Sequence, residues 1–578
     1  LSLTRLTGGV SGELNVAERK LGSRNLADNV VVFQNDGSGL TAISLSQIAD
    51  GSVPASQITY AGTDWAGRVK VIVLNSAIGG GYIFGRANYT ANYDEEGNRE
   101  GNAQLSVEYG AGKSTPTFET GYVVRNGDIV GITMPVVKHS YLLQSTDELT
   151  TTFREAFHIA KTGRPGPVLI DVPSDLASEL MTFEYPDDVN LPSYKPTYRG
   201  NAKQIKQAVS RIKQAERPVL YVGGGTVSSG ASEELKALAE LMQIPVVTTL
   251  MGKGAFPASH ELNLGPVGMH GSKYANLAMT ESDLIIAAGA RFSDRVTGKL
   301  DEFAPHADVI HIDIDPAEIG KVREVQVPIV GDLKGVLAGI VSTLEKEGAR
   351  PGTGTWVEQI SAWRTRYPFY HPGVGDDPDE IVPEVVLKKL SESLDPQNSV
   401  VVTEVGQHQM WAAQHIAHTR PENFITSSGL GTMGFGLPAA VGAQVARPND
   451  TVVCISGDGS FMMNVQELGT VKRKQLPLKI VLLDNQRLGM VRQWQQLFFQ
   501  ERYSETTLTD NPDFLMLASA FGIPGQHITR KDQVEAALDT MLNSDGPYLL
   551  HVSIDELENV WPLVPPGASN SEMLEKLS

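Results

Sequence analysis

The segments TVVCISGDGS (451–460) and KIVLLDN (479–485) decide the fold of the C-terminal part of this chain. Each contains a run of β-branched and aliphatic residues that ends in glycine, aspartate or asparagine. A run that is apolar at every position predicts a strand buried on both faces, as in a parallel sheet covered by helices. Because the carboxyl ends of parallel strands meet at one edge of the sheet, the two polar endings are expected to lie close together.

These polar endings carry oxygen atoms suited to a metal ion. Asp458 offers a carboxylate and Asn485 an amide oxygen, and Mg²⁺ prefers such ligands and usually shares them with a phosphate group. Gly457 and Gly459 let the backbone approach a diphosphate closely, and Ser460 completes the motif. A Gly-Asp-Gly segment alone is also compatible with an ordinary turn. With a strand before it and Asn485 after the next strand, it predicts a diphosphate–magnesium site.

The same alternation of apolar runs and helical patterns continues from about Val130 to the C-terminus. On one expected helix, Leu235, Leu238, Leu241 and Met242 fall on a single face. The pattern predicts an α/β fold with doubly wound parallel sheets. Further apolar runs are PVLIDVP (167–173), PVLYVGGG (218–225), DLIIAAGA (283–290), DVIHIDID (308–315) and PYLLHVSID (547–555).

Proline, glycine and aspartate mark the expected domain boundaries. The segment 185–200 is predicted to be a linker, and 347–355 and 371–380 bracket a second boundary. These boundaries define a middle domain near 200–345, a C-terminal domain near 380–560 and a tail at 561–578. Residues 1–125 differ, because short alternating stretches among Gly, Asn, Ser and Thr predict β-hairpins or poorly ordered chain, an atypical segment with no recognised domain type.

Composition narrows the class of protein. The chain has 578 residues and a net charge of -19, and an acidic surface argues against nucleic-acid binding. No run of 18 apolar residues occurs, so no membrane span is expected. The single cysteine, Cys454, excludes disulfides within the chain and fits a reducing cytoplasm. Its apolar surroundings favour a buried core residue over a nucleophile.

Five segments of the C-terminal part resemble the acetolactate (acetohydroxyacid) synthase family of thiamine-diphosphate enzymes, especially its bacterial members. They are GQHQMWAAQH (406–415), SSGLGTMGFGLPAA (427–440), GDGSFMMNVQEL (457–468), LDNQRLGMVRQWQ (483–495) and VWPLVPPGASN (560–570). The resemblance implies that Gly406, Gln407 and His408 hold the diphosphate. It also implies that Met433 wedges under the cofactor and keeps it bent, and that the Arg487 carbonyl completes the magnesium shell.

Met490 and Trp494 lie four residues apart, on one face of an expected helix. A core stripe and a substrate pocket both fit this spacing. The resemblance implies the pocket, with Trp494 favouring 2-ketobutyrate as the second substrate.

The middle domain contains no GxGxxG motif, so the pattern alone gives weak support for a dinucleotide site. Its segments nevertheless resemble the FAD-binding domain of the same family, in which the flavin takes no redox part. The residues implied to line FAD are Arg164, Gly223, Gly224, Thr249, Met269, His270, Gly289, Arg291, Asp313, Ile314 and Asp332. Arg295 is implied to face the substrate channel, where a guanidinium suits a 2-ketoacid carboxylate; a surface ion pair is its alternative role.

The family begins with a pyrimidine-binding domain that supplies a catalytic glutamate from an RHEQ-type strand end. Here only residues 126–185 resemble a remnant of that domain, and no RHEQ, GPG or FQE sequence precedes them. No catalytic acid can be assigned among the glutamates upstream, which are Glu13, Glu18, Glu95, Glu96, Glu100, Glu108 and Glu119.

The resemblance implies a transferase of isoleucine and valine biosynthesis that requires thiamine diphosphate, Mg²⁺ and FAD. It would decarboxylate pyruvate on thiamine diphosphate and condense the hydroxyethyl carbanion with a second 2-ketoacid, pyruvate or 2-ketobutyrate. A homodimer or homotetramer is expected, and a small regulatory subunit is left open. The alternatives are another thiamine-diphosphate decarboxylase or oxidase, and a cofactor-binding scaffold that lacks the N-terminal glutamate.

Overall fold

The computed structural model describes residues 129–369 and 379–576, together with the backbone of strands between residues 32 and 125. The chain divides into two compact units, Leu1–Lys195 and Pro196–Ser578. None of the described helices has the length and apolar character needed to cross a bilayer.

In the first unit, the described strands before residue 126 pair in antiparallel fashion. A five-stranded sheet has the order β3 (Tyr60–Ala61), β4 (Arg68–Ile78), β5 (Gly81–Tyr93), β6 (Arg99–Ala111) and β7 (Thr120–Arg125). A separate pair is formed by β1 (Val32–Asn35) and β2 (Leu40–Ile43). Strands that neighbour one another in sequence therefore also neighbour one another in the sheet.

The rest of the first unit is a small α/β element. Helix α2 (Ile129–Thr133) precedes β8 (His139–Leu142), and α3 (Leu149–Lys161) connects β8 to the parallel strand β9 (Val168–Asp171). The Lys138 ammonium donates to the carbonyl oxygens of Ile159 and Thr162, both at 2.6 Å, and to the Tyr194 hydroxyl at 2.8 Å. These bonds fasten the end of α3 to the start of β8 and to the chain that leaves the unit.

The middle domain contains a six-stranded parallel sheet with the order β12-β11-β10-β13-β14-β15. This is the 3-2-1-4-5-6 order of dinucleotide-binding folds, and the chain reverses direction across the sheet between β10 and β13. The strands are β10 (Pro218–Val222), β11 (Val246–Thr248), β12 (Asn263–Pro266), β13 (Leu284–Ala288), β14 (Asp308–Asp313) and β15 (Val327–Val330).

Both faces of this sheet are buried, as the apolar runs predict. Leu220 and Val222 of β10 join one core cluster, whereas Val219 and Tyr221 join the other. Helices α4 (Ala202–Gln214), α6 (Ser232–Met242) and α9 (Leu333–Lys346) cover the first face. Helices α7 (Lys273–Thr280) and α10 (Gly354–Arg366) cover the second.

The C-terminal domain has a second six-stranded parallel sheet, with the order β17-β16-β18-β19-β21-β20. Its topological switch point lies between β16 and β18. The strands are β16 (Ser399–Thr403), β17 (Phe424–Thr426), β18 (Thr451–Gly457), β19 (Lys479–Asp484), β20 (Gly525–Ile528) and β21 (Tyr548–Ser553). The predicted fold class, with doubly wound parallel sheets in two domains, is confirmed.

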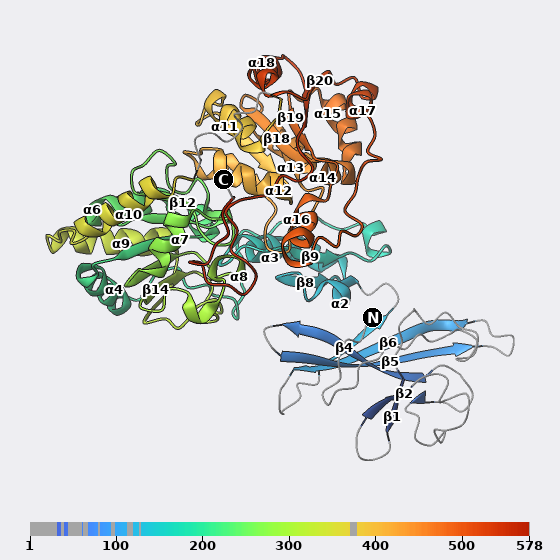
Figure 1. Cartoon of the computed structure of the whole chain (residues 1–578). Helices are drawn as coiled ribbons and strands as arrows, with labels where there is room; N and C mark the ends of the chain where they lie inside the picture. Colours follow the sequence, from blue (N-terminus) through green and yellow to red (C-terminus); the bar gives the residue numbers. More distant parts are fainter. Residues whose placement is uncertain are drawn as a thin grey trace. The chain divides into compact units, whose positions relative to one another are not determined.

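Helices cover both faces of this sheet as well (Figure 1). One face packs against α11 (Pro383–Ser393), α12 (Gln407–His415) and α18 (Val534–Leu542). The other packs against α13 (Gly436–Ala446), α14 (Asp458–Met463), α15 (Leu468–Lys474) and α17 (Phe514–Ala520). Cys454 of β18 is fully buried in the second cluster, which confirms its assignment to the core.

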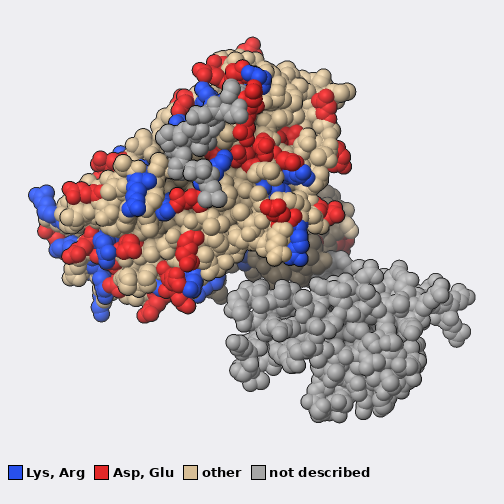
Figure 2. Space-filling model, viewed as in Figure 1, with Lys and Arg blue, Asp and Glu red and all other residues tan. Residues whose placement is uncertain are grey.

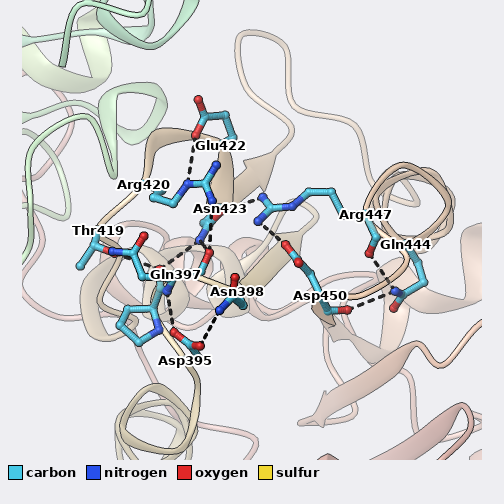
Figure 3. A network of polar contacts seen from close by, with 11 residues as sticks. Asp395, Gln397, Asn398, Thr419, Arg420, Glu422, Asn423, Gln444, Arg447 and Asp450 are labelled. Atoms are coloured by element: carbon cyan, nitrogen blue, oxygen red, sulfur yellow. Dashed lines mark hydrogen bonds and ion pairs between the residues drawn. The ribbon is translucent and has the colours of Figure 1, made fainter. Parts of the chain in front are cut away.

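A polar network joins the amino-terminal ends of β17, β16 and β18 (Figure 3). At its centre is Asn423, which is fully buried. Its Nδ2 donates to the carbonyl oxygens of Pro396 at 3.0 Å and Gln397 at 3.3 Å, and its Oδ1 accepts from Arg447 Nη1 at 2.7 Å. Arg447 also pairs with Asp450, so the segments before three neighbouring strands are tied together.

The tail after β21 returns from the C-terminal domain to the middle domain. Figure 1 shows it in dark red beside α8 (Asp294–Thr297). Val564 N donates to Met269 O at 2.8 Å, and Asn570 Nδ2 donates to Val296 O at 2.8 Å. The tail therefore fixes loops at the carboxyl edge of the middle sheet.

Candidate functional site

Two loops meet at the switch point of the C-terminal sheet. Gly406 begins α12 just after β16, and Gly457 ends β18. A Cβ on either glycine would lie 2.8 Å from the His408 imidazole, which therefore occupies the space between the loops. Ser460 Oγ donates to Val405 O at 3.1 Å and connects the loops again. The sequence-predicted residues Gly406, His408, Gly457 and Ser460 are thus brought together.

His408 is buried, and burial lowers its pKa to about 3, so the ring is neutral at pH 7. Its Nε2 is buried and has no hydrogen-bond partner among the described residues. An unsatisfied buried ring nitrogen is costly, and a phosphate oxygen near it would accept a hydrogen bond. The donor set at the switch point therefore fits a diphosphate group.

Asp458 and Asn485 directly follow neighbouring strands of the same sheet, in which Gly457 pairs with Leu483. Both side chains are buried, at 2% and 6% exposure. Asp458 Oδ2 accepts from Asn511 Nδ2 at 2.9 Å. The spacing argument thus places the two expected metal ligands side by side.

Asp484 adds a second carboxylate beside Asp458. Burial and the neighbouring Asp484 raise the pKa of Asp458 to about 7. Burial also acts to raise the pKa of Asp484, but hydrogen bonds with His551 and the Gln486 backbone outweigh it and hold that pKa below its usual value. The two neighbouring carboxyl groups offer oxygen atoms of the kind that a divalent cation prefers.

No group of three or more His, Cys, Asp or Glu side chains in the described part of the chain is arranged to hold a metal. A cation at Asp458 would therefore need amide, carbonyl or phosphate oxygens to complete its shell. That requirement suits Mg²⁺, which binds with one or two carboxylates and a substrate phosphate.

Gln407 positions Asn485. Its Oε1 accepts from Asn485 Nδ2 at 3.1 Å, while its Nε2 donates to Gln493 Oε1 at 3.0 Å and Glu558 O at 2.8 Å. The amide nitrogen of Asn485 is thereby engaged, and its Oδ1 faces the Arg487 side, where it accepts from Arg487 N at 3.2 Å. The carboxamide of Gln407 thus orients the Asn485 side chain, which is the expected metal ligand.

Arg487 follows a sharp turn. Gln486 has φ 54°, in the left-handed region that non-glycine residues rarely adopt. The Arg487 side chain bonds to Glu556 and Thr507. Only the backbone of Arg487 is therefore a candidate to contact a metal, in agreement with what the family resemblance implies.

Met433 lies in a loop that approaches the Gly-Asp-Gly turn. A Cβ on Gly459 would lie 3.6 Å from Met433 Cε, although 26 positions separate the two residues. Gly429, Gly431 and Gly434 have φ of 84°, 76° and 83°, so this loop follows a path that other residues would resist. The structure brings the expected wedge residue to the expected diphosphate loop.

Met490 and Trp494 lie on α16 (Gly489–Phe498). Met490 packs against the core cluster of the C-terminal sheet, so part of its role is structural. Trp494 is half-buried, and its ring lies 5.6 Å from that of Phe498. Packing in the core therefore explains the position of Met490 better than it explains the position of Trp494.

The expected flavin residues of the middle domain follow the carboxyl ends of its strands. Gly223 and Gly289 lie on the two sides of the switch point, and a Cβ on Gly223 would lie 2.1 Å from Gly289 O. This close approach leaves no room for side chains there. Asp313 ends β14, and Gly224, Thr249, Ile314 and Asp332 follow β10, β11, β14 and β15 at the same edge. A crevice at this edge is where doubly wound sheets bind ligands.

Met269 and His270 follow β12 and are held by the tail. Burial lowers the pKa of His270 to about 4, and its Nδ1 lies 3.2 Å from Pro562 O. Arg291 and Arg295 are exposed, and Arg295 lies 3.7 Å from Asp294 Oδ2. Arg164 belongs to the first unit, between α3 and β9. Gly223, Gly224, Thr249, Gly289, Asp313, Ile314 and Asp332 are thus grouped at one edge of the middle sheet, and the role of Arg295 stays a prediction.

Sequence reasoning missed Asp484, Asn511, Glu404 and Asn464. Asp484 was detectable in principle, because it directly precedes Asn485 at the end of an apolar run. Asn511 contacts Asp458 from 53 positions away, and no local pattern announces it. The N-terminal glutamates considered as catalytic acids lie outside the residues whose side chains are described.

Comparison with known proteins agrees with this geometry. Residues 404–552 match the model of the thiamine pyrophosphate enzyme C-terminal TPP-binding domain. Residues 205–340 match the central domain of thiamine pyrophosphate enzymes. The range 205–340 contains the whole middle sheet, and the range 404–552 contains the C-terminal sheet except β16 and the last residue of β21. The chain is therefore a thiamine-diphosphate (thiamine pyrophosphate) enzyme by fold and site.

Its relatives define the family within that class. The chain is 62% identical over 451 residues to the acetolactate synthase isozyme 2 large subunit of Escherichia coli (strain K12), covering 78% of this chain and 80% of that protein. It is 48% identical over 455 residues to the acetolactate synthase large subunit of Pyropia yezoensis, covering 77% and 76%. Identity to the large subunit IlvB1 of Mycobacterium tuberculosis (strain CDC 1551 / Oshkosh) is 47% over 457 residues, covering 78% and 73%.

The chain belongs to the acetolactate synthase large-subunit family. The predicted family and the predicted use of thiamine diphosphate are confirmed by these matches. About a fifth of the chain lies outside the alignment with the Escherichia coli protein. The family assignment therefore rests on the remaining four-fifths of the chain.

Proposed function

We propose that this chain catalyses acetolactate formation, in which one 2-ketoacid loses carbon dioxide and its remaining acyl unit joins a second 2-ketoacid. The main supporting observation is the buried group of Asp458, Asp484 and Asn485 in a chain of this family, with the Met433 methyl near the adjacent Gly459. Pyruvate is the proposed donor, and pyruvate or 2-ketobutyrate the acceptor.

In this proposal, Asp458, the Asn485 amide oxygen and the Arg487 carbonyl hold Mg²⁺, and His408 with the Gly406 and Gly457 loops holds the diphosphate. When bound, thiamine diphosphate supplies the carbon nucleophile and the electron sink that decarboxylation requires. Neutral His408 can donate one hydrogen bond without adding charge to the site. The buried position of these groups excludes water from the charged atoms they hold.

The proposal assigns substrate contacts to the exposed Arg295 and the half-buried Trp494. A guanidinium can bind a ketoacid carboxylate through two parallel hydrogen bonds. The indole of Trp494 offers apolar area to the additional methyl group of 2-ketobutyrate. Both assignments come from the family resemblance.

FAD is proposed to bind at the carboxyl edge of the middle sheet without taking part in redox chemistry. The Gly223–Gly289 close approach and the 3-2-1-4-5-6 strand order support a dinucleotide there. Flavin that stays oxidised during anaerobic turnover of pyruvate would agree with this role, and bleaching would contradict it.

Association with a second copy of the chain and with a small regulatory subunit completes the proposal. The similar proteins of Escherichia coli and Pyropia yezoensis are named large subunits, which supports a smaller partner. Sedimentation of the purified chain alone and with a candidate small subunit would test both associations.

A cofactor-binding scaffold without catalysis is the second candidate, because no catalytic glutamate can be assigned before residue 126. One experiment separates the candidates: carbon dioxide release and product analysis with pyruvate, thiamine diphosphate, Mg²⁺ and FAD. We expect acetolactate from the wild-type chain and none from Asp458→Ala, which should also lose magnesium-dependent cofactor binding. Cofactor binding without carbon dioxide release would establish the scaffold, and acetaldehyde or peroxide would indicate another enzyme of the class.

A further inference from the structure

The residue after Met433 is held from two sides. Gly434 N donates to Glu404 Oε2 at 2.7 Å, and Asn464 Nδ2 donates to Gly434 O at 2.7 Å. Both polar groups of this single residue are thus satisfied by side chains from other segments. On the other side of Met433, Thr432 N donates to Ser427 Oγ at 2.8 Å.

Glu404 links this loop to the strand that carries the diphosphate turn. It follows β16 and is fully buried. Its Oε1 accepts a hydrogen bond from Ser456 Oγ, two positions before Asp458. A Cβ on Gly436 would lie 2.5 Å from Glu404 Cγ, so the loop packs directly on this side chain.

Asn464 holds the loop from the end of α14, the helix that Asp458 begins. A Cβ added to Gly434 would lie 2.9 Å from Asn464 Nδ2 and 2.7 Å from Met463 Cβ. Only glycine fits there, and its φ of 83° is one that glycine adopts freely. A loop this rich in glycine has many conformations available unless hydrogen bonds select one.

We propose that Glu404 and Asn464 are positioning residues that fix Met433 in the place from which it supports the thiamine ring. This inference rests on the proposed binding of thiamine diphosphate. The two side chains act through the Gly434 peptide, which directly follows Met433. Their loss should release the Met433 side chain and leave the diphosphate and metal ligands in place.

A first test uses the chain without cofactor, so that it does not depend on the proposed function. In a sample with ¹³C-methyl methionine, the Met433 methyl signal is assigned by its disappearance in Met433→Leu. We expect Asn464→Ala and Glu404→Ala to move this signal towards the position of a flexible methionine and to sharpen it. Gln466→Ala is the matched control, because it removes a bond to Asn464 Oδ1 at 3.0 Å and leaves the bond to Gly434 intact.

Glu404→Gln should behave like the wild-type chain. It keeps one oxygen for the Gly434 N–H and gains a donor that the Ser456 hydroxyl can accept. If Glu404→Ala does not fold, Asn464→Ala still tests the proposal. The Asn464 side chain is only half-buried, so its removal should leave the chain folded. A Met433 signal that is unchanged in Asn464→Ala would overturn the proposal.

A second test uses the chain loaded with thiamine diphosphate and Mg²⁺. We expect Asn464→Ala to bind thiamine diphosphate within about threefold of the wild-type affinity and to lower kcat for pyruvate by roughly 10–100-fold, with altered circular dichroism of the bound cofactor. An equal loss of affinity and kcat would show a general structural lesion and overturn the positioning role. If the wild-type chain binds no thiamine diphosphate, the proposed function fails, and the supporting role of Met433 fails with it.

Discussion

Gln407→Ala should weaken magnesium binding by a free energy similar to the one it removes from the stability of the fold. The Gln407 Oε1 accepts from Asn485 Nδ2 at 3.1 Å and so orients the amide whose oxygen is the proposed metal ligand. Partners that orient a metal ligand typically contribute 10–100-fold to metal affinity. We therefore expect the Mg²⁺ dissociation constant to rise by roughly 10–100-fold, which corresponds to about 1.4–2.7 kcal/mol.

The other partners of Gln407 keep hydrogen bonds when its side chain is removed. Gln493 Oε1 still accepts from Val560 N at 3.0 Å, and Glu558 O still accepts from Arg492 Nη2 at 2.6 Å. Asn485 Nδ2 is the group that loses a partner. The variant should therefore lose about 1–3 kcal/mol of stability, the usual cost of one buried donor left unsatisfied.

The assay is calorimetric titration of Mg²⁺ at saturating thiamine diphosphate, with thermal unfolding of the same samples. Gln409→Ala is the matched control, since Gln409 lies on the same helix, is equally buried at 4%, and bonds to Thr426 and Ser427 instead. A Gln407→Ala variant with near-wild-type Mg²⁺ affinity would refute the reasoning. So would an equal loss of affinity in the control.

Three further predictions address stability, pH and selectivity. Asn423→Ala should destabilise the C-terminal domain by about 2–4 kcal/mol, because three hydrogen bonds of a fully buried side chain are lost; urea unfolding measures this, with the exposed Asn398→Ala as control. Burial and the nearby Glu558 raise the pKa of Glu384 to about 7, above its value in the unfolded chain, so its ionisation weakens the fold as the pH rises through 7. Glu384→Gln should thus raise the unfolding temperature near pH 8 and change little near pH 5; an equal shift at both would contradict the assignment. Trp494→Leu should remove a 2-ketobutyrate preference of about 1–3 kcal/mol, measured as the product ratio in mixed substrates.

The placement of Asp458 and Asn485 at one edge of the sheet could be predicted from the sequence because it depends on local rules. Asp458 and Asn485 each follow an apolar run, and the parallel-sheet rule places such endings at one edge. Gly457 pairs with Leu483, so Asp458 and Asn485 follow neighbouring strands at the same edge. The same rule accounts for the placement of Gly223 and Gly289 at the switch point of the middle sheet.

The supporting contacts could not be predicted, because they join segments that no periodicity relates. Gln407 meets Asn485 across 78 positions and Gln493 across 86. Helix α10 gives a second example: it lies beyond residue 345, after a segment rich in glycine and proline, yet Trp356 Nε1 donates to Pro218 O at 3.2 Å and packs on the middle sheet. Composition shows that the chain turns there, but not that it returns to the same core.

The two ends of strands β16 and β18 are expected to contribute to different properties, the amino ends to stability and the carboxyl ends to cofactor binding. Their amino ends are joined by the Asn423 network, and their carboxyl ends lead to the His408 and Asp458 loops. A strand is stiff. A substitution at its amino end should therefore lower the fraction of folded chain without changing the conformation of the loops at its carboxyl end. The side chain of Gln407 bonds to Gln493, Glu558 and Asn485 near the carboxyl edge. Its substitution should therefore affect cofactor binding and leave the Asn423 network unchanged. Stability and cofactor binding in this domain should therefore respond to different substitutions on the same two strands.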